Sequence, residues 1–394
     1  MVNVSKKSSL MPASAIRKLV PFADAAQNDG VKVYHLNVGA PDIKSPECAL
    51  EAVRNNTLDH ISYTNSAGLP ELRKGLAERY YHGIGIEVSV PEIIVTVAGS
   101  EAVNLALQIA CDEGEPFYTN YTTFCFESGI ILKAVHTDIE NGFKVPPIEE
   151  FEKLVTPRTK AILISNPGNP TGTLYSKEDM LALGEVARKH NLFLISDEVY
   201  REFCYTDEPH FSAMNIPDLA DNVILVDSVS KRYNLCGCRI GCIVSHNKEV
   251  MEAAMKYAQS RLCPPVYGQI ASIGALDTPK SYFTEVRNEY IARRDYAISR
   301  LNAMDGVYSP TPMGAFYTIA RIPVDDAEKF AKWMLTDFRL DGQTTMVTPA
   351  KSFYKTPGFG GDQIRLAYVL GISELEKAFD ALEAGLREYP CRTI

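Results

Sequence analysis

The sequence lacks any apolar run of the roughly 18 residues that a membrane-spanning helix requires. It also lacks an excess of positive charge, because 49 acidic residues outnumber 40 basic ones and leave a formal net charge of -9. Nucleic acids and anionic membranes bind clustered lysine and arginine, so we expect neither as the main partner. Residues 1–20 are basic and serine-rich without an uninterrupted apolar core. They predict a surface arm leading into a helix and no secretory signal, with a transit peptide as the alternative.

The sequence contains no C-x-x-C pair, although it has nine cysteines. An odd number of scattered thiols without a secretion signal is typical of reduced cysteines, so we expect a cytoplasmic protein. Cys236, Cys238 and Cys242 lie in C-x-C-x3-C spacing, which raises the alternative of a metal site. Zinc sites draw on ligands of recognised spacing, and the nearest histidine in sequence is His246. We therefore interpret the three thiols as small side chains that fill tight spaces, and we expect no metal.

Short apolar runs alternate with helical patterns in the middle of the chain. Four of these runs predict strands, at residues 92–97, 160–165, 192–196 and 222–228. The alternation is typical of an α/β fold, with a mostly parallel central sheet covered by helices. A chain of 394 residues is too long to fold around one small hydrophobic core, so we expect two domains in close contact.

The character of the sequence changes after about residue 280. A long helical pattern at residues 281–301 is followed by a strand pattern at 314–322 and by an amphipathic helix at the C-terminus. In that last helix Ser373 and Glu376 have the spacing of a capping box, and the apolar face comprises Leu375, Ala378, Phe379, Leu382 and Leu386. We expect a large domain at residues 46–285 and a smaller α+β domain formed by both termini, residues 1–45 plus 286–394.

Polar and glycine-rich segments follow each of the four predicted strands. They read "AGSEAV", "NPGNPTG", "DEVY" and "SVSKRYNLCGCRIG" in chain order. In open α/β sheets ligands bind beyond the carboxyl ends of the strands, so these segments predict a site at one edge of the sheet. The alternative is that strand ends are merely polar loops.

Lys231 directly follows the fourth predicted strand. Taken alone it would be a solvated surface charge, but Ser228, Ser230 and Arg239 lie close to it in sequence. A partly desolvated amine near other cations is a nucleophile toward an aldehyde. Serine hydroxyls and an arginine suit a phosphate group. An aldehyde and a phosphate together indicate pyridoxal 5'-phosphate.

The other strand ends supply what this cofactor requires. Gly99 and Ser100 open a helix whose N-terminal N–H groups can meet the phosphate. Asp197 can keep the pyridine nitrogen protonated, and Tyr200 and Asn169 can donate hydrogen bonds to the ring oxygen. The alternatives are that Asp197 caps a helix and that "NPGNPTG" is only a rigid turn.

Together these motifs resemble the class I/II aminotransferases that depend on pyridoxal phosphate, which are aspartate aminotransferase-like proteins of fold type I. The resemblance runs from "LNVGAPD" at residues 36–42 to "QIRLAYV" at residues 363–369. It implies that Lys231 binds the cofactor and acts as general acid and base. It implies a homodimer in which Tyr63 reaches the phosphate of the neighbouring subunit. It further implies that Tyr118 stacks on the cofactor ring, and that Gly39, Asn169 and Arg365 hold the substrate α-carboxylate.

The implied reaction moves an amino group from an L-amino acid to a 2-oxo acid by a ping-pong mechanism, with aspartate-type specificity as one option. A carbon–sulfur lyase or a decarboxylase on the same fold is the alternative within this family. A non-catalytic cofactor-binding regulator and a structural three-thiol metal protein are the alternatives outside it.

The sequence departs from the family pattern in two places. Only Asp112–Glu115 separates the helix after the glycine turn from the segment of Tyr118, where the family has a further strand. Where aspartate-type enzymes often carry an arginine for the distal carboxylate, this chain has Ala258, with Lys256 and Arg261 nearby. The preferred amino donor therefore stays open.

Overall fold

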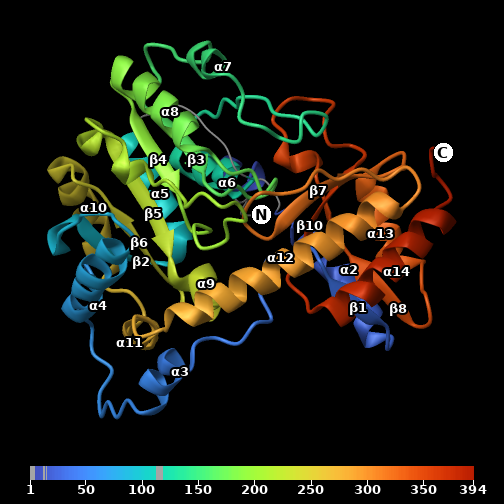
Figure 1. Cartoon of the computed structure of the whole chain (residues 1–394), viewed down its shortest axis with the longest axis horizontal. Coiled ribbons are helices and arrows are strands. Elements are labelled where there is room, and N and C mark those ends of the chain that lie inside the picture. The colour runs from blue at the N-terminus through green and yellow to red at the C-terminus, as the bar shows by residue number, and fades with distance from the viewer. Residues whose placement is uncertain (1–4, 12–13, 15, 112–118) are drawn as a thin grey trace.

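The computed structural model describes residues 5–11, 14, 16–111 and 119–394. Its largest sheet has five strands in the order β2-β6-β5-β4-β3 (Figure 1). These strands are β2 (Ile93–Val97), β3 (Ala161–Ser165), β4 (Phe193–Asp197), β5 (Val223–Ser228) and β6 (Ile240–Val244). The first four coincide with the predicted apolar runs, and the sequence analysis did not assign β6.

The strand directions place all four predicted strand ends at one edge of the sheet. β3, β4 and β5 are mutually parallel, whereas β6 pairs antiparallel with both β5 and β2. Because two reversals cancel, β2 runs in the same direction as β3, β4 and β5. The predicted α/β fold is confirmed, with β6 making the central sheet mixed.

Helices cover both faces of this sheet, since its side chains are apolar on both sides. One face packs under α5 (Ala98–Ala110), α6 (Thr119–Ser128) and α10 (Lys248–Arg261). The opposite face packs under η1 (Leu76–Tyr81), α8 (Lys177–Lys189) and α11 (Val266–Ala275). Shorter helices α3 (Glu47–Arg54), α4 (Pro70–Gly75) and α7 (Ile148–Glu152) lie at the periphery. None of the described helices is both long and apolar enough to cross a membrane.

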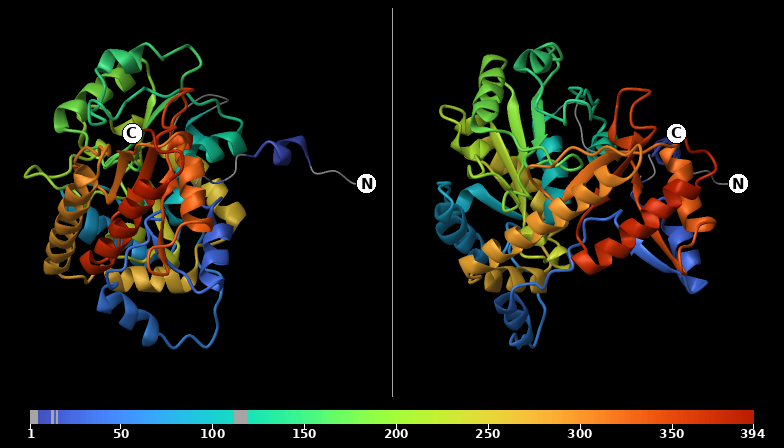
Figure 2. Two further views of the ribbon diagram at one scale, coloured as in Figure 1. Left: turned by 90° about the vertical axis from the view of Figure 1, so that its right-hand side faces the viewer. Right: turned by 45° about the vertical axis from the view of Figure 1, so that its right-hand side comes forward.

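The chain termini build a second layered unit around a separate hydrophobic cluster. Its strands form an antiparallel sheet β7-β10-β9 and a parallel pair β1-β8, and α12 runs from the large sheet to this unit (Figures 1 and 2). The strands are β1 (Lys32–His35), β7 (Tyr317–Arg321), β8 (Gln343–Met346), β9 (Thr348–Pro349) and β10 (Gln363–Ala367). The helices are α2 (Val20–Asn28), α12 (Lys280–Ala303), α13 (Ala327–Thr336) and α14 (Ile372–Glu388), and a short α1 (Lys6–Ser9) precedes them. The domain boundaries at residues 45 and 285 stay a prediction.

The start of α14 differs from the prediction. The predicted apolar face of the helix is buried, but Ser373 makes no capping hydrogen bond because the helix already begins at Ile372. Gly371 is the N-cap, and its N–H donates to Asp42 Oδ2 at 2.9 Å. A carboxylate from the N-terminal segment thus occupies the place of the predicted capping box.

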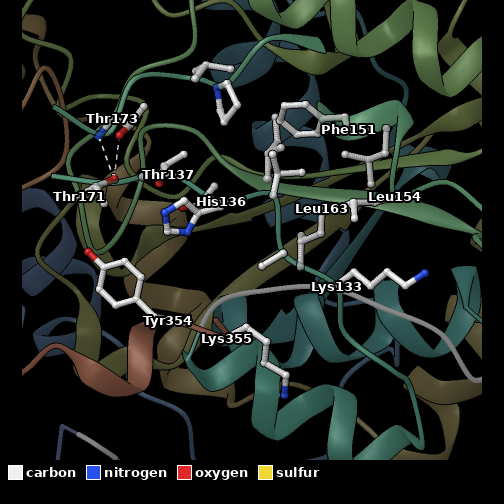
Figure 3. Close-up of a pocket in the computed structure, with 18 of the residues that line it drawn as sticks. Lys133, His136, Thr137, Phe151, Leu154, Leu163, Thr171, Thr173, Tyr354 and Lys355 are labelled. Carbon is white, nitrogen blue, oxygen red and sulfur yellow. Dashed lines mark hydrogen bonds between the residues drawn. The ribbon is translucent and has the colours of Figure 1, made fainter. Parts of the chain in front are cut away.

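The outer edge of β3 pairs with no other strand in the described part of the chain. A cavity of about 260 Å³ lies beside β3, bounded also by α7 and residues 131–137. Figure 3 shows Phe151, Leu154 and Leu163 at one end of this cavity and His136 with Tyr354 at the other. The short segment Asp112–Glu115 and Tyr118 lie outside the described residues.

Candidate active site

A second cavity, of about 220 Å³, lies at the carboxyl ends of β3, β4 and β5. Of the predicted site residues that the structure describes, all except Tyr63 line it, and they come from both sheet-bearing units. They are Gly39, Gly99, Ser100, Asn169, Asp197, Tyr200, Ser228, Ser230, Lys231, Arg239 and Arg365. The structure therefore brings these residues together, and the individual role of each stays a prediction.

Lys231 reaches the cavity from a single helical turn, α9 (Val229–Arg232), which directly follows β5. Ser228 caps this turn, since its Oγ accepts a hydrogen bond from Ser230 N at 3.1 Å. Lys231 Nζ donates to Gly39 O at 2.8 Å and lies 3.6 Å from Cys236 Sγ. The amine thus lies between the N-terminal segment and the cysteine-containing loop.

Asp197 ends β4 and is 9% exposed. Its Oδ2 accepts a hydrogen bond from Tyr121 OH at 2.7 Å, and its Oδ1 accepts one from Val199 N at 3.3 Å. Burial raises the pKa of the Asp197 carboxyl to about 6, although both hydrogen bonds act in the opposite direction. A buried carboxylate of this kind gains most from a cationic partner in the cavity.

The beginning of α5 forms one wall of the cavity through Gly99 and Ser100. A Cβ on Gly99 would lie 3.3 Å from Val199 Cγ1, a tight contact that Val199 could accommodate only by shifting a few tenths of an ångström. Behind it, a Cβ on Gly241 would lie 2.5 Å from the carbonyl carbon of Ala98. The exposed N–H groups of a helix N-terminus, beside the hydroxyls of Ser228 and Ser230, form a cradle suited to a phosphate.

Arg365, from β10, also lines the cavity and is only 1% exposed. Its Nη1 donates to Asn169 Oδ1 at 3.1 Å, and its Nη2 donates to Asn37 O. Its Nε is buried and has no hydrogen-bond partner among the described residues. An unsatisfied buried guanidinium nitrogen is costly, and a carboxylate from a ligand would satisfy it.

Tyr63, Lys256 and Arg261 lie outside the cavity. Tyr63 is 79% exposed on the surface, and its predicted reach into a neighbouring subunit stays a prediction. Arg261 donates to Glu101 Oε1 at 3.0 Å and to Val95 O at 3.0 Å, so it is committed to the protein. Lys256 and Ala258 both belong to α10, where Lys256 is exposed and Ala258 is fully buried on the face that packs against the sheet.

Sequence reasoning missed several residues that line the cavity. Tyr121 contacts Asp197, and Tyr317 OH lies 3.1 Å from Tyr200 OH. Cys236 also lines the cavity, with its Sγ donating to Ser230 O at 3.0 Å. Cys242 is instead buried against Tyr81 OH at 3.2 Å, and burial raises the pKa of its thiol to about 12. The spacing of the cysteines did not predict that Cys236 lines the cavity and Cys242 is buried elsewhere, because spacing alone does not show which thiol faces a cavity.

The chain is similar to known aminotransferases over nearly its whole length. The sequence profile of the family described as "Aminotransferase class I and II" matches residues 31–382. An aspartate aminotransferase from Thermotoga maritima is 31% identical over 96% of this chain and 98% of its own length. One from Pyrococcus abyssi is 32% identical over 98% of both chains.

Solved structures show the same similarity. The aspartate aminotransferase of Thermus thermophilus with maleate has a TM-score of 0.88 and 30% identity, covering 98% of this chain and all 100% of that one. An alanine aminotransferase from Pyrococcus furiosus has a TM-score of 0.87 and 31% identity at the same coverage. The chain therefore belongs to the class I and II aminotransferases, a family of enzymes that typically use pyridoxal phosphate.

Proposed function

We propose that this chain is a pyridoxal-phosphate-dependent aminotransferase that moves the amino group of an L-amino acid to a 2-oxo acid. One observation carries the proposal. A single cavity holds an amine at Lys231, a buried carboxylate at Asp197 and a buried guanidinium with a free Nε at Arg365. These three groups match an aldehyde, a pyridine nitrogen and a substrate carboxylate.

The residues present suit pyridoxal phosphate. Lys231 Nζ would hold the aldehyde carbon, and Asp197 would hold the pyridine nitrogen, which would relieve the burial of its charge. Gly99, Ser100, Ser228, Ser230 and Arg239 line the part of the cavity that suits the phosphate. When bound, the cofactor supplies an electron sink for negative charge that develops at the substrate Cα.

The chain's own residues account for orientation and proton movement. Arg365 can bind the substrate α-carboxylate through its fork, and Asn169 fixes that fork through the 3.1 Å hydrogen bond. Holding the carboxylate orients the Cα–H bond relative to Lys231, which is a positioning contribution. Lys231 Nζ is the base that the cavity presents to the proton at the substrate Cα. Tyr200 and Tyr317 enclose this end of the cavity.

A homodimer and the substrate side chain are further parts of the proposal. The exposed Tyr63, with Leu58 and Ile61 exposed beside it in sequence, supports an interface between two copies of the chain. Of the described residues that line the cavity, the cationic ones are Lys231, Arg239 and Arg365. Since Arg261 is paired with Glu101, a second substrate carboxylate would need a cation from the partner subunit. Aspartate, alanine, methionine and aromatic donors are therefore to be compared directly.

Absorbance of the purified protein with pyridoxal phosphate tests the proposal. We expect a band of lysine-bound cofactor that an amino acid abolishes and a 2-oxo acid restores. Lys231→Ala should prevent covalent attachment after borohydride reduction, whereas the exposed Lys256→Ala should retain it. A band that no amino acid changes would refute amino transfer, and release of pyruvate with ammonia would favour the lyase.

A further inference from the structure

A network of buried charges lies behind the cavity, on the opposite face of the sheet. Its centre is Asp227, which is 1% exposed and does not line the cavity. Asp227 Oδ2 accepts hydrogen bonds from Arg232 Nη2 and from Tyr81 OH, the latter at 3.0 Å, and Arg201 Nη2 lies 3.9 Å away. Burial opposes the charge of Asp227, but Arg232 and Arg201 outweigh it and hold its pKa below the ordinary value. Other titratable groups that interact with Asp227 are the thiol of Cys242, the hydroxyls of Tyr80 and Tyr233, and the carboxyl of Asp197.

The same network extends to two glutamates. Arg201 Nη2 lies 2.8 Å from Glu198 Oε2, and Glu198 Oε1 accepts hydrogen bonds from the hydroxyls of Ser196 and Ser212 at 3.0 Å each. Arg232 Nε lies 3.3 Å from Glu202 Oε1. The Arg232 guanidinium also lies 3.6 Å above the ring of Tyr80, which covers its outer side.

Residues of the buried network are sequence neighbours of residues that line the cavity. Asp227 precedes Ser228, and Arg232 follows Lys231; likewise Glu198 follows Asp197, and Arg201 follows Tyr200. In β5 this follows from the period of two in a strand, which points Ser228 into the cavity and Asp227 to the other face. Four of the groups proposed to hold the cofactor, Asp197, Tyr200, Ser228 and Lys231, are thus each adjacent in sequence to a charged residue of the buried network.

Stability alone gives no reason for this arrangement. Taking ionised groups out of water is costly, and replacing a buried ion pair by apolar side chains is often neutral or stabilising. The charges of Asp227 and Arg232 are better explained by the directional hydrogen bonds that the pair makes. The bond from Arg232 to Asp227 is the most informative, because it joins the last residue of α9, the turn that carries Lys231, to the β5 residue just before its N-cap.

We propose that Asp227 is a positioning residue for Lys231, acting through its ion pair with Arg232. The pair closes the chain from the end of β5 to the residue after Lys231, so the turn cannot open and the lysine side chain enters the cavity in one direction. Tyr81 and Ser228 N complete the coordination of the Asp227 carboxylate, at 3.0 Å and 2.7 Å. This inference rests on the proposed role of Lys231 in binding the cofactor.

Three variants test it, namely Asp227→Asn, Arg232→Gln and the double variant. The measurements are the rate at which pyridoxal phosphate attaches covalently to the apoprotein, together with kcat and KM of the loaded enzyme. We expect Asp227→Asn to lower the attachment rate and kcat by about tenfold or more while KM changes by less than about threefold, because misplaced groups lose rate rather than binding. The double variant should lose less than the product of the two single losses, because both substitutions break the same pair.

The pair of Arg300 and Asp380 supplies the matched control. Its atoms lie 2.7 Å apart between α12 and α14, away from the cavity, so Asp380→Asn should leave the attachment rate unchanged. If Asp227→Asn does not fold, Arg232→Lys replaces it, since lysine keeps the charge but loses the fork, and the same slower attachment is expected.

An unchanged attachment rate in the single variants, or multiplicative losses in the double variant, would overturn the positioning role. If the wild-type protein itself fails to attach the cofactor at Lys231, the proposed function and this inference both fail. If the wild-type protein attaches it normally and the variants do too, only the inference fails.

Discussion

Replacing Arg365 by lysine should weaken substrate binding by an amount that can be estimated from the hydrogen bonds of Arg365. Arg365 is held by Asn169 Oδ1 and Asn37 O, which leaves the buried Nε and the open side of the guanidinium for a ligand carboxylate. Lysine keeps the positive charge but presents a single point of contact, so one charge-assisted hydrogen bond to the substrate is lost. Such a bond contributes about 1.5–3 kcal/mol, which corresponds to a loss of roughly 10- to 150-fold in kcat/KM.

The assay is steady-state amino transfer at several amino acid concentrations, with cofactor attachment followed separately. We expect kcat/KM to fall by this factor for the amino acid and for the 2-oxo acid, since both carry the same α-carboxylate. Covalent attachment of the cofactor should be preserved, because Arg365 contacts Asn169 and Asn37 and is not among the residues proposed to hold the phosphate.

Arg339→Lys is the matched control for Arg365→Lys. Arg339 is half-buried and donates to the carbonyls of Met334 at 3.3 Å and Leu335 at 3.0 Å, but it does not line the cavity. Its substitution should affect stability without a selective loss in kcat/KM. If Arg365→Lys keeps kcat/KM within about threefold of the wild type, the carboxylate contacts another group and the reasoning fails.

Three further predictions concern the cofactor. Burial raises the pKa of Asp197 in the folded apoprotein to about 6. Between about pH 4 and 6 the folded protein therefore keeps a proton that the unfolded chain has lost, so the free energy of unfolding falls as the pH rises through this range. Asp197→Asn should therefore stabilise the apoprotein by up to about 3 kcal/mol at pH 7 and not near pH 4, as measured by urea unfolding; an equal gain at both would contradict this. Gly241→Ala should cost about 1–3 kcal/mol and weaken cofactor binding, because its Cβ would lie 2.5 Å from the backbone of Ala98, whereas Gly237→Ala, with nothing within 4 Å, should be neutral in both measurements. Tyr63→Phe should weaken cofactor binding about tenfold in a titration without lowering the apoprotein's melting temperature; unchanged affinity would exclude its hydroxyl from the phosphate site.

The local sequence was sufficient to predict the elements that position the site. β2, β3, β4 and β5 each follow from a short apolar run bounded by polar residues, because a strand buried on both faces needs apolar side chains at every position. The position of the polar groups at one sheet edge was predicted because each group directly follows a strand in the sequence. Lys231, Asp197, Asn169 and the cradle serines could therefore be assigned to one edge of the sheet before their distances were known.

Other features depended on contacts between segments far apart in the sequence. The N-cap of α14 is set by Asp42, over 300 residues away, so the local Ser373–Glu376 spacing was misleading. Arg261 resembled a free cation in the sequence, and only its contact with Glu101 removes it from the substrate.

The sequence by itself determined four strands of the large sheet, the order of the motifs and the residue types that suit the cofactor, because each depends on neighbours a few positions apart. Only the tertiary structure decided which thiol faces the cavity, which arginines are already paired, and that Asp227 and Arg232 meet behind Lys231. Those properties depend on which side chains other segments bring within a few ångströms. A buried charge is stable only where such partners exist, so its role is a property of the packed chain and not of its local sequence.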